Sequence, residues 1–466
     1  MTANITLPPR SARPGPAGRH PAGPDWTASN QAGSHPTPSR PEFQAQDRLP
    51  RLLPPEPGTP PTLAAHLGRF GGLPYRGGPR LLIASVEAAG LTGRGGAAFP
   101  VHRKLTAVDS QRRRSIVVAN GAEGEPASNK DKTLLWNSPH LVLDGLQLAA
   151  EAVGADRALL YLHRHQGLHE RLTAALAERA AARLDRVGVE LVEAPPRFLA
   201  GEESALASNI NGGLARPTFK QPRVFERGVA GRPTLVQNVE TLAHLALIGR
   251  YGAAWFRGLG TTAEPGSMLC SVLQADGRSG VLELAIGQPL AGVLALGAGV
   301  QAVLCGGYHG AWLRPADAAQ LPLTNAALKP IGAFVGAGVL IALPAKSCGL
   351  AETARVARYL ALESAGQCGP CFNGLPRIAG ALADLAGRPG QRTSPQTRAD
   401  LERWAGLVTG RGACHHPDGT VRFVGSALTV FRDEITAHEL GRCTATSRAP
   451  FLPLPSGTPV DESDWR

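Results

Sequence analysis

Short apolar segments alternate with amphipathic stretches along the first half of the chain. The segments 116–119, 158–162 and 189–193 consist mainly of aliphatic and β-branched residues and predict strands. Between them, Ser138 followed by Pro139 is typical of a helix start, and a second helix is expected at 167–182. Strands that alternate with helices predict an α/β fold with a mostly parallel sheet, in which ligands bind at the carboxyl ends of the strands.

The pattern further along the chain predicts two more domains. In residues 265–345, apolar segments lie between Gly-rich turns, which indicates a small, mainly β domain whose last stretch, 331–345, resembles a buried strand pair. Residues 346–445 have helical periodicity, and four helices are expected at 350–363, 376–385, 396–408 and 426–439. A bundle of this kind can hold a metal cluster at one end.

Both ends of the chain have the composition of tails. Residues 1–61 hold 15 of the 40 prolines, so we expect a disordered segment before an α/β domain at 62–252, which begins with a helix near Thr62. Residues 446–466 form a second predicted tail. No apolar run is as long as a membrane span and the start of the chain lacks a signal-peptide pattern, so we expect a cytoplasmic protein without direct membrane insertion.

Net charge and cysteine content argue against two classes of protein, namely nucleic-acid-binding proteins and secreted proteins held together by disulfides. The formal net charge is +11, but the arginines are dispersed and aromatic residues make up only 5%, which argues against nucleic-acid binding. Seven unevenly spaced cysteines are too few for the disulfide framework of a secreted protein of this length.

A glycine-rich loop is the main candidate ligand site. Residues 90–104 read GLTGRGGAAFPVHRK, in which Gly93, Gly95 and Gly96 leave the backbone accessible and Lys104 adds a positive charge nearby. Such a loop can direct several amide N–H groups at an anion, although many similar loops are ordinary turns. This loop and the segment that starts at Asn120 are both expected at the carboxyl ends of strands, which favours a ligand site.

Two further segments carry polar groups at positions where a ligand could bind. Gly201, Glu202 and Glu203 follow a predicted strand and turn, and residues 233–242 (PTLVQNVETL) are expected to open another helix. A helix start with free N–H groups and polar side chains can bind an anion or a heterocycle. The alternative for the two glutamates is a solvated turn.

Three of the cysteines have the spacing of a metal site. Cys368 and Cys371 form a C-x-x-C motif, and Cys414 lies further on, next to His415 and His416. This arrangement suits an iron–sulfur cluster, a zinc site with three cysteines and one histidine, or buried structural cysteines. The other four cysteines have no such partners and are interpreted as core or surface residues.

Together these segments resemble the NADH-binding flavoprotein subunit of respiratory complex I and its relatives in formate dehydrogenases and bidirectional hydrogenases. The resemblance covers roughly residues 62–440. It rests on five motifs in the expected order: GRGGAAFPVHRK, NGAEGEPASNKDK, AGEESAL, PTLVQNVETL and ESAGQCGPC. The first two are also similar to the corresponding subunit of Rnf-type complexes, whereas the double glutamate and the cysteine segment favour the complex I branch.

The resemblance implies the ligands of the chain and the residues that bind them. FMN would be held by Gly93, Arg94, Gly95, Gly96, Lys104, Asn120, Glu123, Gly201, Glu202, Glu203, Gln237, Asn238 and Thr241. NADH would contact Phe99, Glu125 and Lys220, and a four-iron, four-sulfur (4Fe-4S) cluster would be bound by Cys368, Cys371 and Cys414. The middle domain would be a β-grasp domain of the soluble-ligand-binding type. No separate catalytic side chain is implied.

The chain departs from the family pattern at three places. Ala365 stands where the family has its first cluster cysteine, so the fourth ligand would be His415, His416, Cys348, a partner's group or an exogenous ligand, or the cluster would have three iron atoms or be absent. Ala122 replaces a carboxylate near the flavin, and two expected aromatic residues are assigned to Ala107 and Arg223.

These features lead to one main hypothesis and two alternatives. The main hypothesis is an FMN-dependent oxidoreductase subunit that passes electrons from NADH or NADPH through FMN to the cluster and then to an iron–sulfur partner protein. The first alternative is a subunit reduced by a ferredoxin-like partner without NADH, which the missing aromatic residues suggest. The second is a non-enzymatic docking subunit that contains zinc or no metal.

Overall fold

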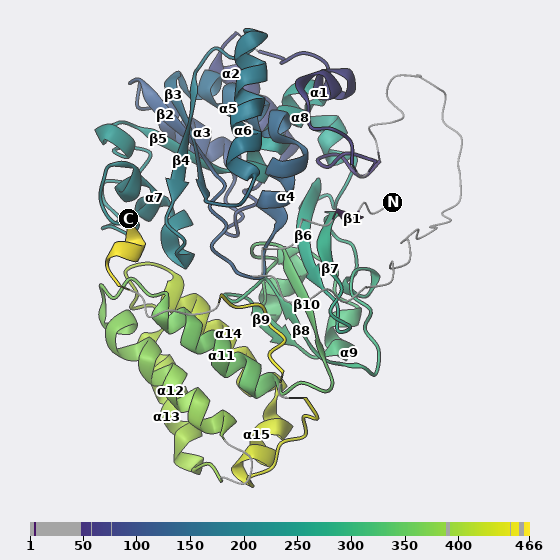
Figure 1. Cartoon of the computed structure of the whole chain (residues 1–466), viewed down its shortest axis with the longest axis vertical. Coiled ribbons are helices and arrows are strands. Elements are labelled where there is room, and N and C mark those ends of the chain that lie inside the picture. The colour runs from purple at the N-terminus through teal and green to yellow at the C-terminus, as the bar shows by residue number, and fades with distance from the viewer. Residues whose placement is uncertain are drawn as a thin grey trace, which may run out of the picture.

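The computed structural model describes residues 4–5, 48–56, 58–75, 77–387, 392–447, 449–455 and 461–466. Three parts follow one another along the chain: an α/β domain, a β domain beside it, and a helical bundle at the opposite end of the molecule (Figure 1). This is the α/β architecture, with the order of domains, that the sequence predicts.

The first domain is built on a four-stranded parallel sheet with the strand order β4-β3-β2-β5. Its strands are β2 (Ser115–Asn120), β3 (Ala155–His163), β4 (Val189–Ala194) and β5 (Thr234–Asn238). The first three confirm the predicted strands and extend them by a few residues. β5 corrects the prediction of a helix over 233–242, because Leu235 pairs with Val117 of β2 and the helix begins only at Val239.

Helices cover this sheet, and α5 and α8 pack closely against each other. Gly145 of α5 permits this contact, because a Cβ atom at this position would come within 1.9 Å of the carbonyl oxygen of Leu242 in α8. The helices are α1 (Leu63–Phe70), α2 (Pro79–Ala89), α3 (Val101–Asp109), α4 (Lys130–Asn137), α5 (Pro139–Val153), α6 (Leu168–Ala181), η1 (Phe198–Gly201), α7 (Glu203–Ile210), η2 (Val229–Gly231) and α8 (Val239–Arg257).

The second domain contains a mixed sheet with the strand order β1-β7-β6-β10-β8-β9. The central strands β6 and β10 run parallel and their neighbours antiparallel, as in a β-grasp sheet. Its elements are β1 (Asn4–Ile5), β6 (Ser267–Leu273), β7 (Ser279–Ala285), η3 (Leu290–Gly292), β8 (Val300–Cys305), β9 (Ala311–Leu313), α9 (Pro315–Ala319), α10 (Asn325–Leu328), η4 (Lys329–Ile331) and β10 (Val339–Pro344).

The apolar stretch 331–345 forms one strand, not the predicted pair. Gly332, Gly336 and Gly338 all have positive φ angles, so the backbone turns repeatedly before β10 begins at Val339.

The third domain is the helical bundle. It contains α11 (Gly349–Leu362), a π-helical turn η5 (Pro370–Gly374), α12 (Leu375–Ala386), α13 (Pro395–Val408), α14 (His416–Val430) and α15 (Arg432–Glu439). Three helices match the predicted ones. The fourth prediction, 426–439, is wrong, because two helices cover this region and the first of them begins ten residues earlier at His416, with Pro417 in its first turn.

The predicted boundaries of both tails are wrong, because each tail includes residues that pack into the folded domains. Most of the first, 1–61, lies outside the described residues, but Leu52 and Leu53 are fully buried and the N–H of Leu52 donates to Oε2 of Glu283 at 2.8 Å. In the second, 446–466, the N–H of Leu452 donates to Glu352 at 2.8 Å and Trp465 is buried within a short 3-10 turn, η6 (Ser463–Trp465). Apolar side chains in both segments therefore add to the cores.

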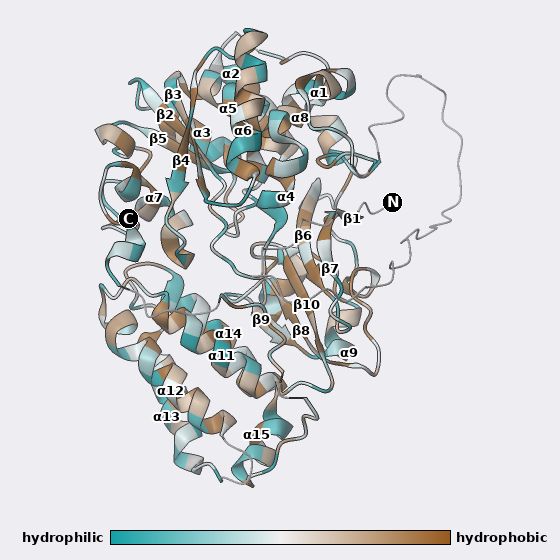
Figure 2. Ribbon diagram, in the orientation of Figure 1, coloured by the Kyte–Doolittle hydropathy of each residue, from teal (hydrophilic) through white to brown (hydrophobic). Residues whose placement is uncertain are grey.

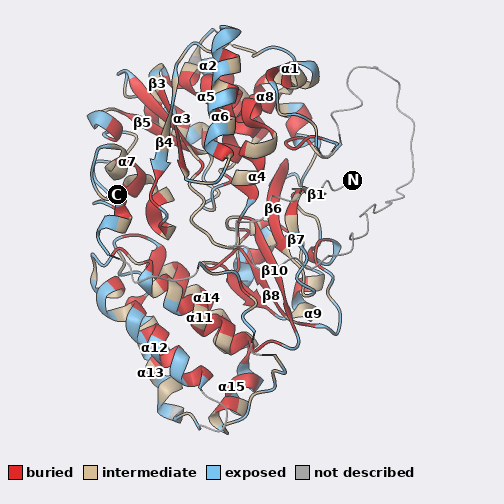
Figure 3. Ribbon diagram, in the orientation of Figure 1, coloured by how far each residue is buried: buried red, intermediate tan, exposed pale blue. Residues whose placement is uncertain are grey.

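The two sheets form the apolar centres of their domains. Their strands are largely hydrophobic in Figure 2 and largely buried in Figure 3, while helices such as α6 and α13 present polar residues to solvent. Among the described residues, no helix is both long and apolar enough to cross a membrane.

Candidate functional site

The glycine-rich loop lies against the carboxyl end of β5 and the start of α8. The N–H of Arg94 donates to Oγ1 of Thr241 at 2.9 Å, and a Cβ atom on Gly95 would lie 3.3 Å from Cβ of Asn238. Gly96 has φ +113°, a conformation that residues with a side chain rarely adopt. Glycine is therefore required here by backbone conformation and by close packing.

The side chain of Arg94 serves the structure of the loop. It is buried, its Nη1 donates to Oγ1 of Thr92 at 2.9 Å, and its Nη2 donates to the carbonyl of Pro265 at 3.3 Å. Burial lowers its pKa. These bonds direct the guanidinium toward the β domain, and the backbone N–H of Arg94 is bound to Thr241, so Arg94 holds the loop in place.

A cavity of about 970 Å³ lies next to the loop, a volume suitable for a nucleotide cofactor. It is lined by α3, α7 and the segment that precedes β5. Seven of its lining residues were predicted from the sequence to bind ligands or to replace family aromatics: Phe99, Lys104, Ala107, Glu202, Glu203, Lys220 and Arg223.

Phe219 also lines this cavity and was not among the residues predicted from the sequence. Its exposed fraction is 84%, and that of Phe99 is 46%. Two exposed aromatic rings on one cavity provide surfaces on which a flat heterocycle can stack. Phe219 therefore provides an aromatic ring four residues before position 223, where the family has one. In the sequence, its position next to Lys220, a predicted nucleotide contact, could have indicated this role.

Lys104 and the two glutamates are arranged in different ways. Nζ of Lys104 forms an ion pair with Oε2 of Glu203 at 3.1 Å and donates to the carbonyl of Val236 at 3.4 Å. The carboxylate of Glu202 instead caps α7, where it accepts bonds from the N–H groups of Ser204 and Ala205. Lys104 and Glu203 thus form the charged pair at the cavity, and Glu202 holds the helix in place.

Three polar side chains meet at the ends of the central strands. Asn120 and Asn238 are register partners, and Nδ2 of Asn120 donates to the carbonyl of Gly201 at 2.8 Å. The neighbouring Gln237 is buried, and its Nε2 has no hydrogen-bond partner in the described part of the chain. An unpaired buried donor is costly, so its presence beside the loop fits a site that receives acceptor atoms from a bound cofactor.

A buried charge network supports this end of the sheet. Lys130 lies between Oδ1 of Asp131 at 2.6 Å and Oε2 of Glu240 at 2.9 Å, and Asp131 accepts a bond from Asn238 at 2.7 Å. Burial raises the pKa of Asp131 to about 6, whereas Glu240, despite its burial, is held at a pKa of about 2 by the ammonium of Lys130. No role was predicted for these residues, although NKDK ends one of the matched motifs.

Glu123, predicted to contact the flavin, is fully engaged elsewhere. Its carboxylate accepts bonds from Ser128 and from the N–H groups of Asp131 and Lys132, and it pairs with Nζ of Lys132 at 3.3 Å. It therefore caps the start of α4 and does not line the cavity.

Glu125 joins the first domain to the β domain. Its Oε2 accepts a bond from the N–H of Tyr308 at 2.8 Å and lies against Gly307, where a Cβ atom would come within 2.7 Å of that oxygen. Desolvation by burial raises the pKa of Glu125 to about 7. This carboxyl group can therefore hold or release a proton near neutral pH.

The three motif cysteines gather between α11, η5 and the start of α14. Cys371 and Cys414 are buried and Cys368 is partly buried. Burial raises the pKa of Cys371 to about 12, and the neighbouring Cys368 and Cys414 contribute to this rise. Neighbouring cysteines of this kind are the ligands expected of an iron–sulfur cluster or a zinc ion.

The candidates for a fourth ligand are positioned very differently. Ala365 is buried with Leu199 and Trp465. Both ring nitrogens of His416 are engaged, with His309 at 3.0 Å and with the carbonyl of Leu360 at 2.8 Å, whereas the side chain of His415 is 90% exposed. His415 is thus the more available of the two histidines.

A second, smaller cavity lies between Cys414 and the first cavity. It has a volume of about 320 Å³ and is lined by Phe198, His309, Cys414 and His416. Six residues line both cavities: Glu202, Ser204, Thr218, Lys220, Arg223 and His415. The two candidate cofactor sites are therefore neighbours, although they belong to different domains.

A parallel sheet with a glycine-rich loop at its edge, beside a helical domain with a C-x-x-C motif, is the arrangement expected of flavin and iron–sulfur electron-transfer proteins. Two family models match the chain: the Nuo51 FMN-binding domain over residues 86–247 and the NADH-ubiquinone oxidoreductase-F iron-sulfur binding region over 351–438. The chain belongs to this family of flavoproteins, as the resemblance of its motifs indicated. FMN and a 4Fe-4S cluster, the cofactors predicted from the sequence, are those of the two matched regions.

Individual relatives agree with this assignment. An F-type subunit of NADH-quinone oxidoreductase from Rhizobium meliloti is 29% identical over 387 residues, which cover 78% of this chain and 90% of the relative. Its counterpart in the NADH-quinone oxidoreductase of Escherichia coli is 28% identical, over 77% of this chain and 84% of its own. The crystal structure of an NAD+-reducing [NiFe]-hydrogenase in the H2-reduced state has a chain that superposes with a TM-score of 0.71 at 30% identity, over 80% of this chain and 63% of that chain.

Proposed function

We propose that the protein is the FMN-containing subunit of an NADH oxidoreductase, which takes electrons from NADH and passes them through its iron–sulfur cluster to an iron–sulfur partner protein. The adjoining cavities support this proposal, because Phe99 and Lys104, near the glycine-rich loop, line the larger one and Cys414 lines the smaller one. Bound FMN supplies the conversion of two-electron into one-electron transfer.

The loop and the strand ends are the groups that would hold FMN. The backbone N–H groups of Gly95 and Gly96 suit a phosphate, since those of Gly93 and Arg94 already donate to the carbonyl of Phe99 and to Oγ1 of Thr241, and Lys104 adds a positive charge. Asn120, Gln237, Asn238 and Thr241 lie at the ends of the same strands and at the start of α8. Gly201 lies beside Asn120, which donates to its carbonyl, while Glu202 and Glu203 line the cavity and Glu203 pairs with Lys104 at 3.1 Å.

Phe99 and Phe219 are the proposed stacking surfaces for the nicotinamide nucleotide. They line the same cavity as Lys220 and Arg223, whose charges suit its phosphates. Glu125 is a further predicted contact, at the junction with the β domain. These aromatic rings favour NADH oxidation over the alternative in which only a ferredoxin-like protein reduces the flavin.

The visible spectrum of the anaerobically purified full chain, recorded before and after addition of NADH, tests the proposal. Flavin bands that bleach with NADH are the expected result. Bands that bleach only with dithionite would favour a protein electron donor, and a chain with zinc but neither flavin nor iron would be the docking subunit.

Phe219→Ala tests the assignment of the nucleotide site. Loss of one stacking contact, worth about 0.5–1.5 kcal/mol, raises the KM for NADH by about 2- to 10-fold without a change in flavin content. Phe372→Ala is the matched control, since Phe372 is also exposed (73%) but lies on the helical bundle. An equal effect of both variants would contradict the assignment.

The partner and the location of the protein are proposals. Because the relatives include a subunit of NADH-quinone oxidoreductase and a chain of an NAD+-reducing [NiFe]-hydrogenase, we expect this chain to act with a partner, which we propose to be an iron–sulfur protein that receives the electrons. A cytoplasmic location remains a prediction from the sequence.

A further inference from the structure

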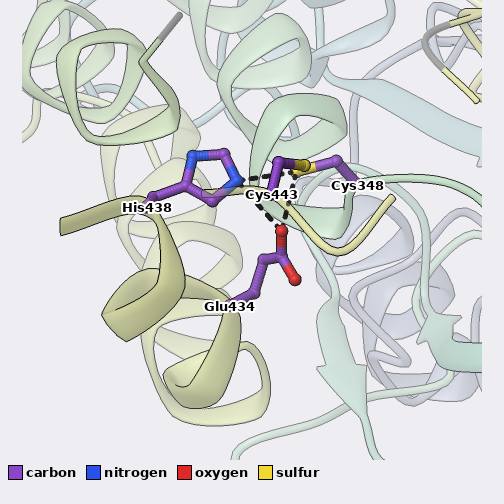
Figure 4. A group of neighbouring side chains, drawn as sticks. All are labelled: Cys348, Glu434, His438 and Cys443. Carbon is purple, nitrogen blue, oxygen red and sulfur yellow. Dashed lines mark hydrogen bonds and ion pairs between the residues drawn. The ribbon is translucent and has the colours of Figure 1, made fainter. Parts of the chain in front are cut away.

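Four potential metal ligands converge at a second place in the helical bundle. They are Cys348, Glu434, His438 and Cys443, and one donor atom of each lies within 4.8 Å of the donor atoms of all the others (Figure 4). None of them belongs to the cysteine motifs assigned to the iron–sulfur cluster. Cys348 and Cys443 also lie outside residues 351–438, the range matched by the iron–sulfur family model.

The fold brings the four residues together from three segments. Cys348 is the residue that precedes α11, directly after the turn that follows β10. Glu434 and His438 lie one turn apart on α15, so their side chains share one face of the helix. Cys443 belongs to the segment after α15, which returns toward Cys348, since the N–H of Thr446 donates to the carbonyl of Lys346 at 3.0 Å.

The distances between donor atoms are those of a compact coordination site. Sγ of Cys348 lies 3.6 Å from Nε2 of His438 and 3.9 Å from Oε1 of Glu434, and the last two atoms are 3.0 Å apart. Tetrahedral coordination, with bonds of about 2.3 Å to sulfur and about 2.0–2.2 Å to nitrogen and oxygen, separates ligand atoms by roughly 3.3–3.8 Å. A metal ion would thus require only small movements of these side chains.

Burial and charge also favour a cation here. Cys348, Glu434 and His438 are all less than 10% exposed. In the described part of the chain, the carboxylate of Glu434 has no Lys or Arg partner, and its one ion pair is with His438. A buried carboxylate normally has a compensating positive charge.

Surrounding groups hold the ligands in place. Glu434 accepts hydrogen bonds from the backbone N–H of Thr444 at 3.1 Å and from the hydroxyl of Thr444. The N–H of Ala351 donates to Sγ of Cys348 at 3.3 Å. Outer contacts of this kind orient the ligands of metal sites in proteins.

We propose that Cys348, Glu434, His438 and Cys443 form a structural zinc site, separate from the iron–sulfur cluster. Two thiolates and an imidazole select a borderline-soft ion such as Zn²⁺ over Mg²⁺ or Ca²⁺, which take oxygen ligands. Four protein ligands leave no open position, as expected of a structural site. On binding, Zn²⁺ displaces the two thiol protons to solvent, with no change in oxidation state. The ion would join α15 and the segment after it to the start of α11, and so close the bundle.

Zinc and iron contents of the purified full chain, measured by plasma mass spectrometry, test this site. We expect one zinc per chain, which is lost in Cys348→Ala and in Cys443→Ala and retained in Cys305→Ala, a matched change of a buried cysteine in β8. Cys368→Ala distinguishes the two metal centres, because it should lower iron and leave zinc unchanged. Zinc that disappears with Cys368, or that persists in both ligand variants, would overturn the proposal.

X-ray absorption at the zinc edge of the unaltered protein gives a test that does not depend on whether the variants fold. We expect two sulfur ligands at about 2.3 Å and two nitrogen or oxygen ligands at about 2.0–2.2 Å. Four sulfur ligands, or a chain without zinc whose Cys348 and Cys443 form a disulfide, would overturn the proposal.

Discussion

Lys130 is a buried charge that supports the structure around the proposed cofactor site. It is 2% exposed and lies within 3 Å of carboxylate oxygens of Asp131 and Glu240. Glu240 also accepts a bond from the N–H of Leu269, in the β domain, at 2.8 Å. The pair of carboxylates therefore supports both the end of β5, through Asn238, and the contact between two domains.

We predict that Lys130→Met destabilises the protein by about 3–5 kcal/mol, because it leaves two buried carboxylates without their cation. Urea unfolding followed by circular dichroism measures this change. The control is Lys329→Met, at an exposed position, with an expected effect within about 0.5 kcal/mol. Similar small effects at both positions would show that the network does not stabilise the fold.

Glu125 gives a prediction about pH. Its pKa rises from 4.5 in the unfolded chain to about 7 in the folded protein because of burial, so the folded state binds the proton more tightly. The stability that this proton provides is present below pH 4.5 and is lost as the pH rises toward 7. Glu125→Gln removes this dependence, and we expect the loss of stability between pH 5 and pH 8 to shrink by about 1–2 kcal/mol.

Urea midpoints at the two pH values measure the effect of Glu125→Gln. Glu170→Gln, a change of an exposed glutamate on α6, should leave the pH dependence of the wild-type protein intact. A Glu125→Gln variant with the wild-type pH profile would show that this carboxyl group titrates normally.

At the scale of elements, the glycine-rich loop adopts a backbone conformation that its glycine residues permit. The loop runs from the bridge between Thr92 and Pro100 to the start of α3 and contacts α8 through Arg94. The glycines of the loop could be recognised in the sequence. The contact of the loop with α8 could not be predicted from the sequence. Sequence periodicity also failed where a short apolar run was ambiguous, as in β5, and where two helices meet at Phe431 between α14 and α15.

We predict that Gly96→Ala weakens flavin binding by about 5- to 30-fold, because a side chain at φ +113° strains the loop by about 1–2 kcal/mol. Fluorescence of the flavin released during dialysis measures the loss. Gly188→Ala is the matched control, since its Cβ would point into open space and its φ is ordinary. Equal flavin retention in the two variants would mean that the loop does not form the flavin site.

At the scale of the whole molecule, the helical bundle is attached to the first domain near the two cavities. Oε2 of Glu363 accepts a bond from the N–H of Phe198 at 2.8 Å and pairs with Arg197 at 3.0 Å. The ring of Phe198 contacts those of His309 and His416. The C-terminus lies at the same junction, beside α7 (Figure 1), and the guanidinium groups of Arg197 and Arg216 lie over the buried ring of Trp465 there.

We predict that Cys368→Ala removes the visible absorbance of the cluster but leaves the flavin-to-protein ratio unchanged, because the two cofactors belong to separate domains. Iron content and flavin fluorescence, measured on the same sample, check this expectation. Cys305→Ala, in the β domain, should preserve both cofactors. Loss of flavin together with iron, in a variant with wild-type circular dichroism, would show that the sites depend on each other.

The sequence by itself determined the family, the order of the domains and the cofactors. These features depend on local motifs, such as GRGGAAFP and CGPC, whose glycines and thiols have few physical alternatives. Periodicity was equally sufficient for β2, β3 and β4, because short apolar runs between turns leave a clear pattern.

Only the tertiary structure decided which residues meet across long distances in the chain. It directed Glu123 to cap α4, brought the aromatic ring of Phe219 to the cavity, and packed Leu52 and Trp465 into the cores. It also brought Cys348 to α15, where Glu434 and His438 lie. The physical reason is that hydrogen bonding, burial and charge compensation depend on neighbours in space, and these neighbours come from segments whose separation in the sequence carries no information about contact.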